Sequence, residues 1–291
     1  MHFAFTDAMC DPAHYIPLAK AADALGYRTF PIGDSICYPE QADGEYPYLD
    51  DGGREFLDGA PFIDPFQLTA ALSTVTTRLR FRTAVLKLPI REPVLVAKQV
   101  SSLAVLSGNR FEFGVGLSPW IEDFRVTHSD WRSRAQRIEQ QIEIIRGLMS
   151  GQYFSFHSEF YDIPRIKLCP VPSAAVPIIY GGHSEAAVRR AARLCDGLTL
   201  AGGTMAETLD IASKVTAYRR EYERQHLPFI LHAGVSDLRG VDDVRRLEDA
   251  GVTELTFGPR NPYVPDTMTV EQKIRAAERF AENVIAKVGG P

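Results

Sequence analysis

The sequence predicts a closed barrel of eight parallel β-strands, each followed by an α-helix, that is, a (β/α)8 barrel. Short β-branched and aromatic runs alternate with amphipathic helical runs along all 291 residues, and this alternation indicates parallel strands joined by crossover helices. Eight such units in a chain of this length favour a barrel over an open sheet. The segment TDAMCDPAH after the first strand holds no glycine, whereas a doubly wound sheet normally carries its glycine fingerprint there.

The expected strands are short and rich in β-branched and aromatic residues. In chain order they are residues 2–5, 27–33, 79–86, 110–116, 176–181, 197–203, 229–236 and 252–258. The expected helices have apolar residues at helical spacing, and two of them end in Gly26 and Gly108. They cover residues 12–26, 64–76, 92–108, 131–149, the alanine-rich run after Ser184, 206–224, 241–251 and 270–288.

Two segments interrupt the alternation. Residues 34–61 form a polar loop rich in Gly, Asp, Tyr and Pro, which is too long for a plain connection and is expected to be a lid or a pocket wall. Residues 151–176 alternate aromatic and polar residues, as a small hairpin inserted before the fifth strand would. No linker or low-complexity segment is seen, so a single domain over residues 1–291 is expected.

Composition disfavours several classes of function. The net charge is −5 without a basic run, so nucleic acid is not an expected partner. There is no apolar run of 18 residues and no signal-peptide pattern, so we expect a cytoplasmic protein without a membrane span. The four cysteines are scattered and the seven histidines show no close pairing, so reduced thiols and no metal site are expected.

The functional site of such a barrel lies at the carboxyl ends of its strands. Two consecutive loops there, Gly181–Ser184 and Gly202–Thr204, place two glycines beside a hydroxyl residue. A helix start with glycines is typical of a phosphate site, because its free N–H groups attract anions. The alternative for the first loop is a tight turn in which Ser184 caps the helix.

An ordinary phosphosugar barrel fits less well. Such barrels bind phosphate in the loops after strands seven and eight, whereas the paired glycines here follow strands five and six. No lysine ends strand six, which disfavours a Schiff-base aldolase.

Three segments in a fixed order make the chain resemble a known family: LSGNRFEFGVGLSPW, RSRAQRIEQQIEIIRGLMSG and VPIIYGGHSEAAVRRAARLCDGLTLAGG. They are similar to the luciferase-like monooxygenase superfamily, most closely its branch of coenzyme F420-dependent oxidoreductases. The resemblance runs from AKAADALGY to the final helix. It implies a TIM barrel that binds FMN or the deazaflavin F420 at the carboxyl ends of its strands, often as a homodimer.

The resemblance also implies roles for individual residues. Family members often have a non-proline cis peptide bond behind the flavin ring, and the matching bond here is Ala84–Val85. The phosphate arm of the cofactor would lie against the first glycine loop. The residues expected to bind the cofactor are Ala84, Val85, Gly116, Ser118, Gly181, Gly182, His183, Ser184 and Gly203. Those expected in the substrate pocket are Asp7, Ser35 and Trp120.

The chain departs from the family pattern where protons would be handled. Deazaflavin dehydrogenases often carry Asp-His after strand two, where this chain has Asp34-Ser35. Some also carry a glutamate after strand four, where Leu117, Ser118 and Pro119 stand here. Asp34 is the best candidate for the catalytic proton-handling group. Its alternative role is that of a loop carboxylate that caps backbone N–H groups.

The cofactor decides the reaction. F420 moves hydride and does not activate oxygen, whereas reduced FMN reacts with oxygen. The closer resemblance favours an F420-dependent oxidoreductase acting on a small organic substrate. The alternatives are an FMN-dependent two-component monooxygenase and a deazaflavin-binding protein without turnover, which the missing Asp-His pair would fit.

Overall fold

The computed structural model describes residues 1–46, 49 and 51–288, and the predicted (β/α)8 barrel is confirmed. Parallel strands pair into a ring that closes between the third and the fourth of them, where Phe81 lies opposite Phe111. Within the described residues the ring contains eight strands, namely β1 (His2–Phe5), β2 (Thr29–Ile32), β3 (Arg80–Thr83), β5 (Phe111–Gly116), β8 (Ile178–Gly181), β9 (Gly197–Leu200), β10 (Ile230–Ala233) and β11 (Glu254–Phe257).

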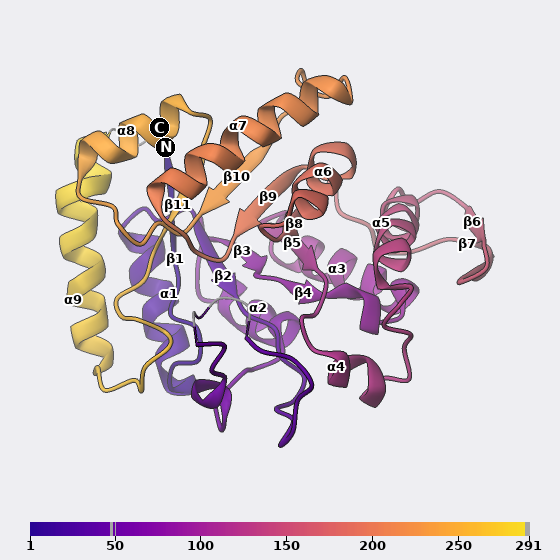
Figure 1. Cartoon of the computed structure of the whole chain (residues 1–291), viewed down its shortest axis with the longest axis horizontal. Coiled ribbons are helices and arrows are strands. Elements are labelled where there is room, and N and C mark those ends of the chain that lie inside the picture. The colour runs from indigo at the N-terminus through magenta and orange to yellow at the C-terminus, as the bar shows by residue number, and fades with distance from the viewer. Residues whose placement is uncertain (47–48, 50, 289–291) are drawn as a thin grey trace.

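Helices follow the strands and cover the outside of the ring (Figure 1). They are α1 (Tyr15–Ala24), α2 (Pro65–Ser73), α3 (Pro93–Leu106), α5 (Arg134–Met149), α6 (Glu185–Leu194), α7 (Met205–Glu221), α8 (Val241–Asp249) and α9 (Val270–Phe280). Local sequence fixes several of their ends. Asp64 caps α2 by accepting the N–H groups of Phe66 and Gln67 at 3.0 and 3.1 Å, and Thr204 and Glu207 form a capping box at the start of α7.

The third predicted strand differs from the expectation of one run over 79–86. It stops at Thr83 and resumes as β4 (Leu86–Lys87), which pairs with the end of β5. Between them the Ala84–Val85 peptide bond is cis, as predicted. Before this break the backbones of β3 and β5 approach closely, because a Cβ atom at Gly114 would lie 1.8 Å from the carbonyl oxygen of Thr83.

Two helical segments also differ from the prediction. A short helix, α4 (Ile121–Val126), follows Trp120 and was not expected. Its six residues are too few to show a helical period in the sequence. The helix predicted over 270–288 consists of α9, a π-helical turn at Ala281–Ile285 and α10 (Ala286–Val288).

Both predicted interruptions of the barrel are confirmed in their described parts. The hairpin consists of β6 (Phe154–His157) and β7 (Asp162–Ile166), which pair antiparallel and project beyond α5 (Figure 1). The long loop 34–61 contains a single 3-10 turn at Glu55–Leu57; its residues 47, 48 and 50 lie outside the described residues. Within the described part of the chain, no helix has the length and apolar character needed to cross a membrane.

Charged side chains fill the amino-terminal part of the barrel interior. Arg82 is fully buried and its guanidinium contacts two carboxylates, Glu112 and Glu254. Arg28 reaches the same carboxylates at 2.8 and 3.2 Å, and the Thr29 hydroxyl donates to Glu254 at 2.6 Å. The neighbouring cations lower the pKa of Glu254 to about 2 despite its burial. These ion pairs form an ionic layer that fills the barrel at the amino-terminal ends of the strands. The opposite end, at the carboxyl ends of the strands, is left for a ligand.

Candidate cofactor and substrate site

The mouth of the barrel, at the carboxyl ends of the strands, contains a valine set against two glycines. Ala84 is exposed and Val85 is half-buried. A Cβ atom at Gly116 would lie 2.6 Å from one methyl group of Val85, and a Cβ atom at Gly181 would lie 2.7 Å from the other. Real Cβ contacts are not this short. Both positions therefore need glycine for Val85 to occupy the mouth.

The helix start next to these glycines is open at its first turn. Gly182 has φ 144°, which favours glycine. The Ser184 hydroxyl caps α6 by accepting the Ala187 N–H at 3.3 Å, so the expected cap is present, while a phosphate site at this loop stays a prediction. The N–H groups of Glu185 and Ala186 precede the first intrahelical hydrogen bond and carry the positive end of the helix dipole. The Glu185 carboxylate accepts from Arg189 and Tyr218, one turn along α6 and on α7.

His183 joins the two glycine loops. Its Nε2 atom accepts the N–H of Ala201 at 3.0 Å, which requires that this nitrogen carry no proton. Burial lowers the pKa of His183, against the opposing effect of Glu207. The hydrogen bond of the neutral imidazole therefore connects the loop after β8 to the loop after β9.

The second glycine loop is capped by acids. The Glu207 carboxylate accepts the N–H and the hydroxyl of Thr204 at 2.7 and 2.9 Å. Asp237 accepts the Met205 N–H at 2.7 Å. A Cβ atom at Gly203, whose φ is 146°, would lie 3.2 Å from Glu207. Since two carboxylates hold the start of α7, a phosphate is far better accommodated at the start of α6.

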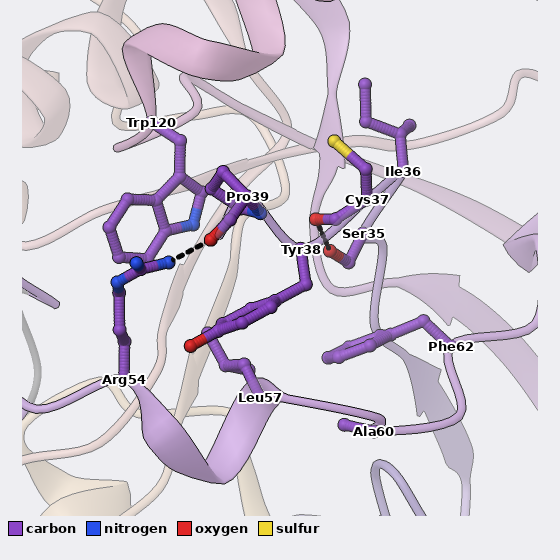
Figure 2. Close-up of a pocket in the computed structure, with 10 residues that line it drawn as sticks. All are labelled: Ser35, Ile36, Cys37, Tyr38, Pro39, Arg54, Leu57, Ala60, Phe62 and Trp120. Carbon is purple, nitrogen blue, oxygen red and sulfur yellow. Dashed lines mark hydrogen bonds between the residues drawn. The ribbon is translucent and has the colours of Figure 1, made fainter. Parts of the chain in front are cut away.

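A pocket of about 150 Å³ lies beside the mouth, under the loop 34–61 (Figure 2). Two residues expected in a substrate pocket, Ser35 and Trp120, line it together with Cys37, Tyr38 and Arg54. The long loop is thus a pocket wall, one of the two roles expected for it. Its aromatic side chains also cover Trp120 from outside: Tyr46 stacks on the indole with centroids 6.2 Å apart and contacts Phe56 and Tyr263.

Asp34, expected to handle a proton, is fully engaged beneath this loop. One carboxylate oxygen accepts the Lys87 N–H at 2.9 Å. The other forms an ion pair with Arg91 at 2.8 Å. The Asp34 side chain is 1 % exposed. These contacts support the alternative of a carboxylate that caps backbone N–H groups, while a catalytic role for Asp34 stays a prediction.

A buried polar cluster stands behind the wall of the pocket. Lys87 Nζ pairs with Asp123 at 2.7 Å, and both side chains are nearly inaccessible. The Ser118 hydroxyl donates to the same carboxylate oxygen and accepts the Trp120 N–H at 3.0 Å. The Cys37 thiol lies 4.0 Å from the other oxygen of Asp123. Ser118 is 2 % exposed, so it orients the tryptophan wall from within.

Asp7 is not brought together with Ser35 and Trp120. It is buried at the end of β1, where it pairs with Arg260 at 2.8 Å and with Lys273 at 2.7 Å. These partners follow it by 253 and 266 residues, so no local signal in the sequence reveals them. The sequence also did not indicate roles for Asp123 and Arg54, because each lies in a segment for which only a loop was expected. In the described residues no group of three or more His, Cys, Asp or Glu side chains could hold a metal ion.

Comparison with known proteins shows the family of the chain. A sequence model described as luciferase-like monooxygenase matches residues 2–237, which is most of the chain. The chain belongs to the luciferase-like monooxygenase family. Among its relatives, the uncharacterized Mycobacterium tuberculosis protein Rv0940c is 53% identical over 290 residues, which are 99% of this chain and 100% of that protein.

Two more distant proteins carry different coenzymes in their names. The F420-dependent glucose-6-phosphate dehydrogenase of Mycobacterium avium is 23% identical over 274 residues, which cover 90% of this chain and 72% of the dehydrogenase. The oxygenating constituent of 3,6-diketocamphane monooxygenase from Pseudomonas putida, solved in complex with FMN, shares the fold with a TM-score of 0.76 at 12% identity. That comparison covers 100% of this chain and 99% of the other. Proteins similar to this chain in sequence or in fold thus include one named for F420 and one solved with FMN.

The mouth of this luciferase-like barrel fits such a cofactor. FMN and F420 each combine a flat ring system with a phosphate. The exposed Ala84 and the half-buried Val85 offer an apolar support for a ring. The two glycines next to Val85 have no side chains, so only backbone lies beside it. The open start of α6 offers N–H groups to an anion.

Proposed function

We propose that the protein is an oxidoreductase that transfers a hydride between coenzyme F420 and a small organic substrate. The observation that carries the proposal is the mouth of the barrel, where Val85 sits against Gly116 and Gly181 beside one open helix start. The similarity to the F420-dependent dehydrogenase of Mycobacterium avium, over 90% of this chain, supports the choice of cofactor.

In this proposal the chain holds the cofactor at two points. Val85 supports the ring, and the loop Gly181–Ser184 with the first turn of α6 receives the phosphate. His183 keeps this loop in place through its bond to Ala201. F420, when bound, supplies the hydride chemistry. The protein supplies orientation and keeps water away through the aromatic cover of Tyr46, Phe56 and Tyr263.

The proton that accompanies hydride transfer needs a carrier on the protein. We propose Lys87 and Asp123 for this task, because the pair reaches the pocket through the Cys37 thiol. Lys87 Nζ donates a hydrogen bond to Asp123 Oδ2 at 2.7 Å. Asp34, whose two oxygens are both engaged, orients the Lys87 backbone instead.

An FMN-dependent monooxygenase is the second candidate. The P. putida oxygenating component, bound to FMN, matches the whole length of this chain in fold. Its cofactor also has one phosphate, which the start of α6 would serve equally well.

Titration of the purified protein with F420 and with FMN, followed by fluorescence, tests the proposal. Micromolar binding of F420 and much weaker binding of FMN are expected, and substrate screening with reduced F420 would follow. Preference for FMN would favour the monooxygenase. Binding of F420 without hydride exchange with any substrate would identify a carrier, and binding of neither would refute the proposal. Light scattering on the same samples tests the predicted homodimer.

A further inference from the structure

The pocket beside the mouth has dimensions and a charge that restrict what can occupy it. Its volume is about 150 Å³. An engineered protein cavity of about 150 Å³ takes up one benzene molecule. The pocket therefore has room for one six-membered ring.

The walls of the pocket suit an aromatic ring. Tyr38 and Phe62, from the connection between β2 and α2, and Trp120, which follows β5, contribute aromatic rings to the lining (Figure 2). Trp120 is fixed from behind by Ser118 and from outside by Tyr46. Aromatic partners gain about 0.5–1.5 kcal/mol beyond simple burial when their rings meet at favourable angles. The pocket thus favours a flat apolar body over a flexible chain.

The charge of the pocket comes from one side chain. Arg54 is the only charged residue among the ten described residues that line it. Its two terminal nitrogens donate to the carbonyl oxygens of Pro39 and Glu40 at 2.6 and 2.9 Å. Carbonyl groups hold the guanidinium in position without neutralising its charge. The nearby Glu55 carboxylate accepts the Arg54 backbone N–H and does not line the pocket.

The remaining polar groups of the lining are neutral. The Ser35 hydroxyl donates to the Cys37 carbonyl oxygen at 3.3 Å. Burial and the nearby Asp123 raise the pKa of the Cys37 thiol, which therefore stays protonated. The lining as a whole is cationic, and it complements an anionic group on the ligand.

We propose that this pocket binds a single-ring aromatic compound that carries one anionic group, such as a carboxylate or a phenolate. Arg54 selects the anionic group, and the three aromatic walls select the ring. The proposal rests on the proposed function in one respect, since it makes such compounds the substrate class of the oxidoreductase.

The test uses Trp120 as the reporter. The chain has two tryptophans, so the variant Trp131→Phe leaves Trp120 as the only one. Benzoate is titrated into this full-length variant while its fluorescence is followed, and benzamide, benzylamine and 2-naphthoate serve as matched probes. Benzoate is expected to bind about tenfold more tightly than benzamide. Benzylamine, which is a cation, and 2-naphthoate, which has a second ring, are expected to bind more weakly than benzamide. Equal binding of benzoate and benzylamine, or tighter binding of 2-naphthoate, overturns the proposal.

Substitution of the arginine separates its charge from its role in the loop. Arg54→Gln should weaken benzoate binding about tenfold and leave benzamide binding unchanged. Arg54→Lys keeps the charge and should keep the preference for benzoate. Arg125→Gln is the matched control, because Arg125 also bonds the long loop, through Asp43, but does not line the pocket. If Arg54→Gln retains the full preference for benzoate, the proposal is wrong.

The design also distinguishes this inference from the proposed function. If benzoate binds as expected while neither F420 nor FMN binds, the pocket stands and the oxidoreductase proposal fails. If F420 binds and benzoate does not, the oxidoreductase proposal stands and this pocket assignment fails.

Discussion

A methyl group of Val85 lies 2.6 Å from the position that a Cβ atom would take on Gly116. The two residues belong to neighbouring segments of the ring, where Lys87 of β4 is paired with Gly116 of β5. Gly181 confines the other methyl group from the adjacent strand. The mouth of the barrel is therefore shaped by a contact that leaves no room for any larger residue at two positions.

Substitution of Gly116 should weaken cofactor binding. Gly116→Ala forces Val85 to move at a cost of about 1–3 kcal/mol, and about tenfold weaker binding of F420 or FMN is expected. Gly240→Ala is the control, since nothing lies within 4 Å of a Cβ atom there; its affinity should match that of the wild type. Fluorescence titration gives both values. Unchanged affinity in Gly116→Ala would show that the cofactor does not depend on Val85.

The ion pair between Asp34 and Arg91 should be structural. Asp34→Asn leaves a largely buried guanidinium unpaired, which is expected to cost about 3 kcal/mol of unfolding free energy. Asp43→Asn is the matched control, because its partner Arg125 and Asp43 itself are mostly exposed, and its cost should stay under about 1 kcal/mol. Urea unfolding measures both. A stable Asp34→Asn protein that has lost turnover would instead support the catalytic role that the sequence suggested.

The two helix caps at the mouth should behave differently. Ser184→Ala and Thr204→Ala each remove a capping hydroxyl, so each should cost about 1 kcal/mol of stability. Only Ser184→Ala should also weaken cofactor binding, since the start of α7 is already held by Glu207 and Asp237. Thermal unfolding and fluorescence titration together check this. Equal loss of affinity in both variants would place the phosphate between the two loops.

Acid should destabilise the protein through His232. This side chain is buried between the hydroxyl groups of Thr199 and Thr256, and burial, followed by the charge of Arg82, lowers its pKa to about 4. The unfolded chain binds a proton near pH 6.5 and the folded chain does not, so stability falls as the pH drops from 6.5 towards 4, by about 3 kcal/mol in total. Below pH 4 this contribution is lost entirely.

Urea unfolding between pH 6.5 and 4.5 isolates this effect from that of Glu254, whose lowered pKa acts between pH 4.5 and 2. His232→Gln should show a shallower loss of stability over this window than the wild type. An identical slope for the two proteins would exclude His232 as the source.

The barrel was predictable because its signals are local. The eight strands of the ring and the eight helices that follow them are indicated by their own apolar residues, as in the run from Val176 to Gly181, whereas the short α4 is not. The cap at Ser184 and the glycines around it are also local patterns. The position of the Ala84–Val85 bond came from the family resemblance, since the cis state of that bond leaves no mark on composition or periodicity.

The electrostatics of the site were not predictable, because they depend on residues far apart in the chain. Asp34 meets Arg91 across 57 residues, and Asp7 meets Arg260 across 253. A carboxylate at the end of a strand has the same appearance in a sequence whether it faces a ligand or a buried arginine. Of the two acids at the second glycine loop, Glu207 lies three residues from Thr204 in a local capping-box pattern, whereas Asp237 lies 32 residues from Met205 and gives no local signal.

The ionic layer inside the ring also determines how the chain can be divided. Arg28, Arg80 and Arg82 lie in the amino-terminal part of the sequence, with Glu112 as their partner there, whereas Glu254 lies near the other end. A fragment that stopped before β8 would enclose three cations with one carboxylate, and the remaining fragment would enclose an isolated carboxylate. Neither half balances its own charge, so a half-barrel from a relative can replace its counterpart here only if it brings the complementary residues with it.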